Sequence, residues 1–167
     1  MTALPKIRRT REAAQRPRPA PVRVGRLLQL ALATLSCSPA AALAACSVAA
    51  QGLSFGSYDP LAGQRVDGAG NIAVTCDAGV AYGIALSSGN GPYAARLLAS
   101  GADSLQYNLY TDASRVLVWG DGTGGTATVA GSGNGTATNV PIYGRIPSGQ
   151  NVRSGSYGDN IVITVTF

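Results

Sequence analysis

The last seven residues of the chain, Ile161 to Phe167, have the clearest secondary-structure pattern in the sequence. Apolar residues alternate along them with the period of two that is typical of a β-strand with one buried face. No charge, proline or glycine interrupts the segment, so it lacks the features that usually keep a sheet edge from pairing with another chain. The pattern predicts a β fold whose final strand is open to completion by a further strand. The alternating apolar positions are Ile161, Ile163, Val165 and Phe167.

The first 44 residues differ sharply from the rest of the chain. Eight basic residues lie within residues 1–26, and the apolar run Leu27–Leu35 follows them. A basic start, a short apolar run and small residues come in the order of a secretory signal peptide, and Ala42-Leu43-Ala44 matches the A-x-A cleavage pattern. We therefore expect residues 1–44 to be a leader with a signal peptide and residues 45–167 to be the exported domain.

The charge of the expected exported domain differs from that of the whole chain. The whole chain has a net charge of +5, but residues 45–167 carry five arginines, seven aspartates, no lysine and no glutamate, which gives −2. We therefore expect no nucleic-acid surface after the leader is removed. The apolar run is shorter than the roughly 20 residues of a transmembrane helix, and no later run is longer. These features predict an exported protein without a transmembrane segment.

The cysteines allow two interpretations. Cys37 lies in the expected leader, so Cys46 and Cys76 remain as an even pair for an oxidising compartment. A bridge between them would destabilise the unfolded chain by roughly 3–4 kcal/mol. Alternatively, Leu43-Ala44-Ala45-Cys46 is a lipoprotein box, with lipid on Cys46 and a free thiol at Cys76. The residues themselves leave both interpretations open.

Residues 45–167 favour strands over helices. They contain all but one of the 22 glycines and few strong helix formers, and period-two alternation recurs along them. About seven short strands separated by Gly, Asn and Pro turns are typical of an antiparallel β-sandwich. Residues 67–71 are turn-like, 93–100 admit a helical turn, and 130–135 are expected to be flexible. The strands are expected at 48–55 with an interruption near Gly52, and around 72–76, 82–86, 105–109, 116–118, 126–129, 136–143 and 161–167.

The residues that common catalytic and metal sites require are missing. The chain has no histidine, and its one glutamate, Glu12, lies in the expected leader. The aspartates are flanked mostly by small turn residues and form no motif with the spacing of a calcium loop. We expect no enzyme activity, no cofactor and no metal. Trp119 is expected in the core, with an exposed contact as the alternative, and Asn134-Gly135-Thr136 is a formal glycosylation sequon.

Six separated motifs follow Cys46 in a fixed order. They are Phe55-Gly56-Ser57-Tyr58-Asp59-Pro60, Val74-Thr75-Cys76, Leu105-Gln106-Tyr107-Asn108-Leu109-Tyr110-Thr111-Asp112, Trp119-Gly120-Asp121-Gly122-Thr123, Tyr143-Gly144-Arg145-Ile146-Pro147, and the ending from Tyr157 to Phe167. Together they resemble the spore coat U domain, the pilin-like domain of archaic chaperone-usher pili, over residues 46–167.

The resemblance implies an all-β, incomplete immunoglobulin-like antiparallel β-sandwich that lacks its last strand, with a Cys46–Cys76 bridge between its first two strands. It also implies that a periplasmic chaperone lends a strand to the groove beside Ile161–Phe167. After an outer-membrane usher has received the subunit, another pilus subunit replaces that strand. The expected strand-acceptor edge comprises Val48, Leu53, Phe55, Ile161, Ile163, Val165 and Phe167.

The sequence departs from the polymerising members of this family before its first cysteine. Those members carry an extension there that serves as the donor strand for the next subunit, whereas cleavage after Ala44 leaves only Ala45. We expect an exported structural subunit of a chaperone-usher type pilus or surface coat. The alternative is a tip adhesin or stand-alone surface-binding module that accepts a strand but does not donate one.

Overall fold

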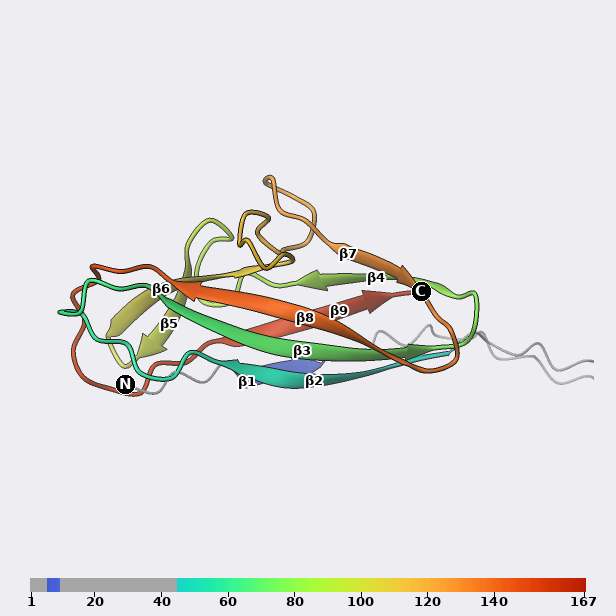
Figure 1. Cartoon of the computed structure of the whole chain (residues 1–167), viewed down its shortest axis with the longest axis horizontal. Coiled ribbons are helices and arrows are strands. Elements are labelled where there is room, and N and C mark those ends of the chain that lie inside the picture. The colour runs from blue at the N-terminus through green and yellow to red at the C-terminus, as the bar shows by residue number, and fades with distance from the viewer. Residues whose placement is uncertain (1–5, 10–44) are drawn as a thin grey trace, which may run out of the picture. The chain divides into compact units, whose positions relative to one another are not determined.

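The computed structural model describes residues 6–9 and 45–167 of the 167-residue chain (Figure 1). The apolar run 27–35 and the cleavage pattern 42–44 lie outside the described residues. The described residues form nine β-strands and no helix. No helix long and apolar enough to cross a membrane is therefore found among them.

The strands form two sheets (Figure 1). One sheet has the order β1 (Lys6–Arg9), β9 (Asn160–Thr166), β4 (Ala81–Leu86) and β7 (Val129–Ser132). The other has the order β2 (Cys46–Ser54), β3 (Val66–Cys76), β8 (Ala137–Ile146), β6 (Asp103–Tyr110) and β5 (Arg96–Ser100). All paired strands are antiparallel except β1 and β9, which are parallel. The predicted fold class, an all-β antiparallel sandwich of the immunoglobulin-like pilin type, is confirmed.

The core is formed by alternate side chains of both sheets, as the period-two patterns predict. On β3 and β4 the fully covered positions are Ile72, Val74, Cys76, Tyr82, Ile84 and Leu86. Trp119 lies in the connection after β6, has 0% exposure, and donates a hydrogen bond from its Nε1 to the Ile84 carbonyl oxygen at 3.1 Å. The expectation that Trp119 is a core residue is confirmed, and its alternative role as an exposed contact is wrong.

The end of β2 packs closely over the middle of its own sheet. A β-bulge between Gln51 and Ser54 interrupts the β2–β3 ladder, where the sequence predicts an interruption near Gly52. The ring of Phe55 then packs edge-to-face on Tyr107, with centroids 5.7 Å apart. A Cβ added at Gly144 would lie 2.7 Å from the Phe55 ring, so only glycine permits this close approach.

Four local predictions are wrong. The turn-like segment 67–71 lies inside β3, which pairs with β2 on one side and β8 on the other, so ladder hydrogen bonds override its turn propensity. Residues 96–100 of the possible helical turn form β5, and residues 130–132 of the flexible stretch belong to β7. Residues 116–118 form no named strand and make one isolated bridge, between Val118 and Tyr110.

Candidate strand-acceptor edge

Strand β9 has β4 on one side and β1 on the other. Its antiparallel pairing with β4 runs from Leu86↔Ile163 to Gly83↔Thr166. On the side away from β4, here called the outer edge, β1 pairs in parallel with residues 160–163. Within residues 45–167, no strand pairs with the outer edge. The strand that covers this edge therefore comes from the segment that the sequence identifies as a leader.

The main-chain groups of β9 alternate between its two edges. Ser87 continues the ladder of β4, and its amide donates to the Val162 carbonyl oxygen at 2.9 Å. The Val162 amide donates to Ser87 Oγ at 2.9 Å, so both main-chain groups of Val162 face β4. Because successive residues of a strand point their amides to opposite sides, the main-chain groups of Ile161 and Ile163 face the outer edge.

Exposure increases along β9 toward the C-terminus. The side chains of Ile161 and Ile163 are 3% and 6% exposed, and Val165 is half-buried against the core. Phe167 is 61% exposed. The predicted apolar face thus begins inside the sandwich and ends with a large aromatic side chain in solvent.

The remaining predicted edge residues lie on and beyond β2, an edge strand of the other sheet. Val48 is half-buried, packed against the core, and β1 contacts β2 as well as β9. Leu53 and Phe55 are only 2% and 5% exposed and are enclosed beside Gly144. The predicted set is thus divided between the two sheets: Ile161, Ile163, Val165 and Phe167 lie on or next to β9, and Val48, Leu53 and Phe55 lie on or next to β2.

A buried carboxylate, that of Asp159, holds the start of β9. The sequence analysis did not predict this role. Asp159 is 3% exposed and accepts hydrogen bonds from Tyr107 Oη at 2.7 Å and from the amides of Asn160 and Asn90 at 2.7 and 3.1 Å. Burial, followed by the hydrogen bond to Asp159, raises the pKa of Tyr107. Gly89 has φ +68°, and a Cβ there would overlap the Asp159 carboxylate. The interpretation of the aspartates as turn residues is wrong for Asp159, whose place directly before the final strand was the available signal.

A buried guanidinium supports the segment that pairs with β9. Arg96 has 0% exposure, and its Nη2 donates to the carbonyl oxygens of Ser87 at 2.9 Å and Trp119 at 2.6 Å. Its Nη1 donates to Asn108 Oδ1 at 2.6 Å. Burial lowers the pKa of Arg96 from its ordinary value. Arg96 thus fixes Ser87, which in turn bonds Val162 of β9.

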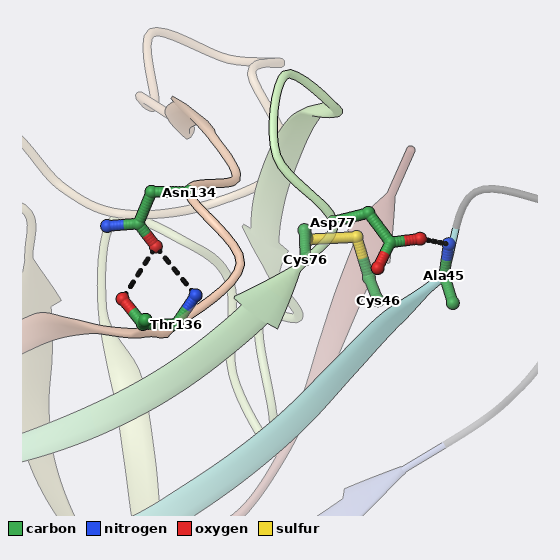
Figure 2. Close-up of a disulfide and its surroundings, with 6 residues drawn as sticks. All are labelled: Ala45, Cys46, Cys76, Asp77, Asn134 and Thr136. Atoms are coloured by element: carbon green, nitrogen blue, oxygen red, sulfur yellow. Dashed lines mark hydrogen bonds between the residues drawn. A yellow bond between two sulfur atoms is a disulfide. The ribbon is translucent and has the colours of Figure 1, made fainter.

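A disulfide joins the start of β2 to the end of β3 (Figure 2). Cys46 and Cys76 are directly opposite in the ladder, with Cα atoms 4.1 Å apart, so the expected bridge is confirmed. Beside it, the Ala45 amide donates to Asp77 Oδ2 at 3.0 Å, and the Asp77 amide donates to the Ala45 carbonyl oxygen at 3.1 Å. The first residue of the expected exported domain is therefore held by a carboxylate.

The formal sequon lies in an exposed turn near this disulfide (Figure 2). Asn134 Oδ1 accepts hydrogen bonds from the amide and the hydroxyl of Thr136 at 2.9 and 2.8 Å. The Gly135 amide donates to the Cys76 carbonyl oxygen at 3.0 Å, which ties the turn to β3. Over residues 45–167, no group of three or more Cys, Asp, Glu or His side chains is arranged to hold a metal ion.

Comparison with known proteins gave matches of three kinds: to a family model, to a relative and to solved structures. The family model of the Spore Coat Protein U domain matches residues 31–164. The matched range begins inside the expected leader, residues 1–44. Protein U of Myxococcus xanthus is 38% identical over 129 residues, which cover 69% of this chain and 71% of Protein U.

The third match is to a solved structure. It is a chain of the CsuC–CsuE chaperone–tip adhesion subunit pre-assembly complex, from the archaic chaperone-usher Csu pili of Acinetobacter baumannii. The TM-score is 0.52 at 20% identity, and the match covers 75% of this chain and 40% of that one. At this level of identity the likeness is one of fold.

Proposed function

Because the chain belongs to the Spore Coat Protein U domain family, we propose that it is an exported structural subunit of a chaperone-usher type pilus or surface coat. In this proposal the subunit is assembled by addition of a donor strand at the outer edge of β9. One observation carries it: in residues 45–167 that edge has no partner strand, although the apolar side chains of β9 face the core. We assign it no catalytic role.

The position of β1 supports the proposal. Residues 6–9 lie on the outer edge of β9 and also contact β2, so one added strand reaches both sheets. If residues 1–44 are removed on export, the main-chain groups of Ile161 and Ile163 lose this partner. An edge with unpaired amide and carbonyl groups is a template for a strand of another chain. The periplasmic chaperone, and later another pilus subunit, would supply that strand, with an outer-membrane usher between the two steps.

The contact between Ala45 and Asp77 supports cleavage after Ala44. Cleavage there would convert the Ala45 amide, which already lies 3.0 Å from Asp77 Oδ2, into an ammonium group beside a carboxylate. The exported domain would then start at the disulfide with no free extension. Such a subunit accepts a strand but does not donate one, which suits the end of a fibre or a coat.

The energy available from strand addition is large compared with the stability of a small domain. Ile161, Ile163 and Val165 of β9 and Val48 of β2 are apolar side chains that face or pack against the core. Full burial of each contributes about 1.5–3 kcal/mol, whereas a whole domain is stable by about 5–15 kcal/mol. The exported domain without a donor strand is therefore expected to be marginally stable.

The experiment is co-purification of the exported protein from a periplasmic extract, with its N-terminus sequenced and its partner identified by mass spectrometry. We expect an N-terminus at Ala45 and an equimolar complex with a chaperone of the chaperone-usher class. Ile163→Asp is expected to abolish the complex, while Thr164→Asp, on an exposed position of the same strand, keeps it. A monomeric exported protein that unfolds cooperatively at high temperature without any partner would contradict the proposal.

A tip adhesin is the second candidate, and one observation favours it. The loop between β6 and Val118 presents Val116 and Leu117 at 73% and 55% exposure, the kind of apolar tip that contacts a surface. Substitution of both by serine is expected to reduce surface adhesion and to leave the chaperone complex intact. Unchanged adhesion would rule this candidate out.

A further inference from the structure

The arginines of residues 45–167 are unevenly distributed. Three of the five surround Asp67: Arg145 at 2.7 Å, Arg115 at 3.4 Å and Arg65 at 3.9 Å. We call these four residues the arginine patch. Three arginines and one aspartate give the patch a charge of +2, in a domain that otherwise carries an excess of acidic residues. The patch is thus a local positive site on a domain of net negative charge.

Asp67 neutralises only one of the three guanidinium groups. Asp67 and Arg145 are opposite one another on β3 and β8 and form two parallel hydrogen bonds of 2.7 and 2.9 Å. The hydrogen bond from Arg145 lowers the pKa of Asp67, with help from the charge of Arg115 and against partial burial. Because one carboxylate faces three guanidinium groups, the patch keeps its net positive charge. The Arg65 side chain is 64% exposed and the Arg115 side chain is 15% exposed.

Arg115 is held in an unfavourable backbone conformation. It has φ +60°, the only positive φ of a non-glycine residue among the described positions. Such a residue in the left-handed region costs of the order of 1–3 kcal/mol and often marks a functional site. Its Nε donates to the Gly144 carbonyl oxygen at 3.1 Å, and its guanidinium lies 5.7 Å from the centroid of the Tyr143 ring. Its Nη1 also donates to the Ala113 carbonyl oxygen at 2.9 Å, so hydrogen bonds hold this guanidinium in place. The position keeps an arginine although glycine or asparagine would suit the backbone conformation better.

Aromatic surface adjoins the arginine patch. Tyr110 of β6 and Tyr143 of β8 are directly opposite in the ladder, so both lie on the same outer face as Arg145, two residues beyond Tyr143. Both tyrosines are half-buried and keep part of their surface in solvent. Guanidinium groups recognise carboxylate and sulfate oxygens, and tyrosines offer a flat amphipathic surface to a ring.

We propose that the arginine patch, with Tyr110 and Tyr143, binds an acidic polysaccharide, whose carboxylate or sulfate groups contact Arg65 and Arg115. A sugar polymer with charged groups fits a net positive patch whose exposed member is Arg65 and which is flanked by aromatic rings. The site lies on the outer face of the β3–β8–β6 sheet and does not involve β9, so it does not depend on strand addition.

The test is titration of the exported protein, in whatever complex it is isolated, with alginate as the carboxylated polymer and dextran sulfate as the sulfated one. Neutral dextran and inorganic phosphate are the reference ligands. We expect salt-sensitive binding of one or both charged polymers, because ion pairs with the polymer are screened by salt. We expect no binding of neutral dextran and no displacement by millimolar phosphate.

The decisive variant is Arg65→Gln/Arg115→Asn, in which asparagine keeps the left-handed conformation at 115 and Arg145 still pairs with Asp67. The matched control is Arg153→Gln, an arginine 86% exposed and 3.9 Å from Asp103. The double variant is expected to weaken polymer binding at least roughly tenfold, because it removes two charge-assisted contacts. The control is expected to bind like the wild type.

Three results would overturn the proposal: neither charged polymer binds, Arg153→Gln weakens binding as much as the double variant, or phosphate displaces the polymer. If the double variant does not fold, Arg65→Gln alone is used, because its exposed side chain supports little structure. Polymer binding by the Arg65→Gln variant is then expected to fall at least about threefold, a loss within the range of one exposed ion pair. Binding with the affinity of the wild type would overturn the proposal. Chaperone binding is measured in parallel and is expected to be unchanged, which separates this test from that of strand addition.

Discussion

The two ends of β9 differ in how they are held. At its start, Asp159 is buried with three hydrogen-bond donors, and Ile161 and Ile163 point into the core. At its end, β1 no longer pairs with it and Phe167 is mostly exposed. A strand fixed at one end and free at the other presents a prepared edge in a defined register. The difference indicates that an incoming strand meets an edge that is ordered at Ile161 and Ile163 and free at Phe167.

The largest expected effect is from a charge at the buried start. Ile163→Asp places a carboxylate at a position that is 6% exposed and is expected to destabilise the chain by about 3–5 kcal/mol, a range typical of an unpaired buried charge. Thr164→Asp, on the exposed face, is the control and should cost less than about 0.5 kcal/mol. Denaturant unfolding measures both. Equal losses would mean that β9 has no inner and outer face.

The second effect concerns the hydrogen bond between Tyr107 and Asp159. Tyr107→Phe and Asp159→Asn are each expected to cost about 1–3 kcal/mol, because the partner is left buried without its bond. In a double-mutant cycle the two losses should be clearly less than additive. Additive losses would show that the carboxylate does not hold the start of β9 through Tyr107.

The third effect tests the free end. Phe167→Ser is expected to change the stability of the domain alone by less than about 0.5 kcal/mol, because the ring is already in solvent. The same change should weaken binding of the donor strand, which would cover that ring. Calorimetric titration with the chaperone measures the second quantity. A loss of several kcal/mol from the unliganded domain would place Phe167 in the core instead.

The fourth effect lies outside β9, on the face of the other sheet. The pKa of Asp67 is lowered below its ordinary value, mainly by the hydrogen bond from Arg145, so its ionised form stabilises the folded state. This contribution is complete above the ordinary carboxyl pKa and disappears as the pH falls through the lowered folded value. For a partly exposed ion pair it is at most about 1 kcal/mol. Thermal unfolding of wild type and Asp67→Asn between pH 7 and pH 2 should show a gap that closes in acid.

The local sequence pattern was enough to predict the fold class. The surroundings of the expected edge residues depend instead on contacts between segments that are distant in sequence. The alternation from Ile161 to Phe167 predicted the strand because its period is a property of neighbouring residues. Leu53 and Phe55 continue the alternation of β2, but their enclosure beside Gly144 depends on the bulge and on β8, which is distant in sequence. No local signal reports that distinction.

The buried polar groups were not predictable for a related reason. Asp159 and Arg96 are buried because Tyr107 and the Trp119 carbonyl oxygen, both distant in sequence, provide their partners. Charged residues are usually exposed, so composition argues against such sites until the fold brings the partners together. The patch around Asp67 depends in the same way on β3, β8 and the loop after β6.

Hydrogen exchange of the exported protein, resolved by residue in β9, tests the central claim most directly. Before a partner binds, we expect the outer-edge amides of Ile161 and Ile163 to exchange fast, while the Val162 amide, bonded to Ser87, is protected. Addition of the chaperone should then protect Ile161 and Ile163 to the level of Val162. Equal, strong protection of all three amides in the isolated exported protein would contradict it.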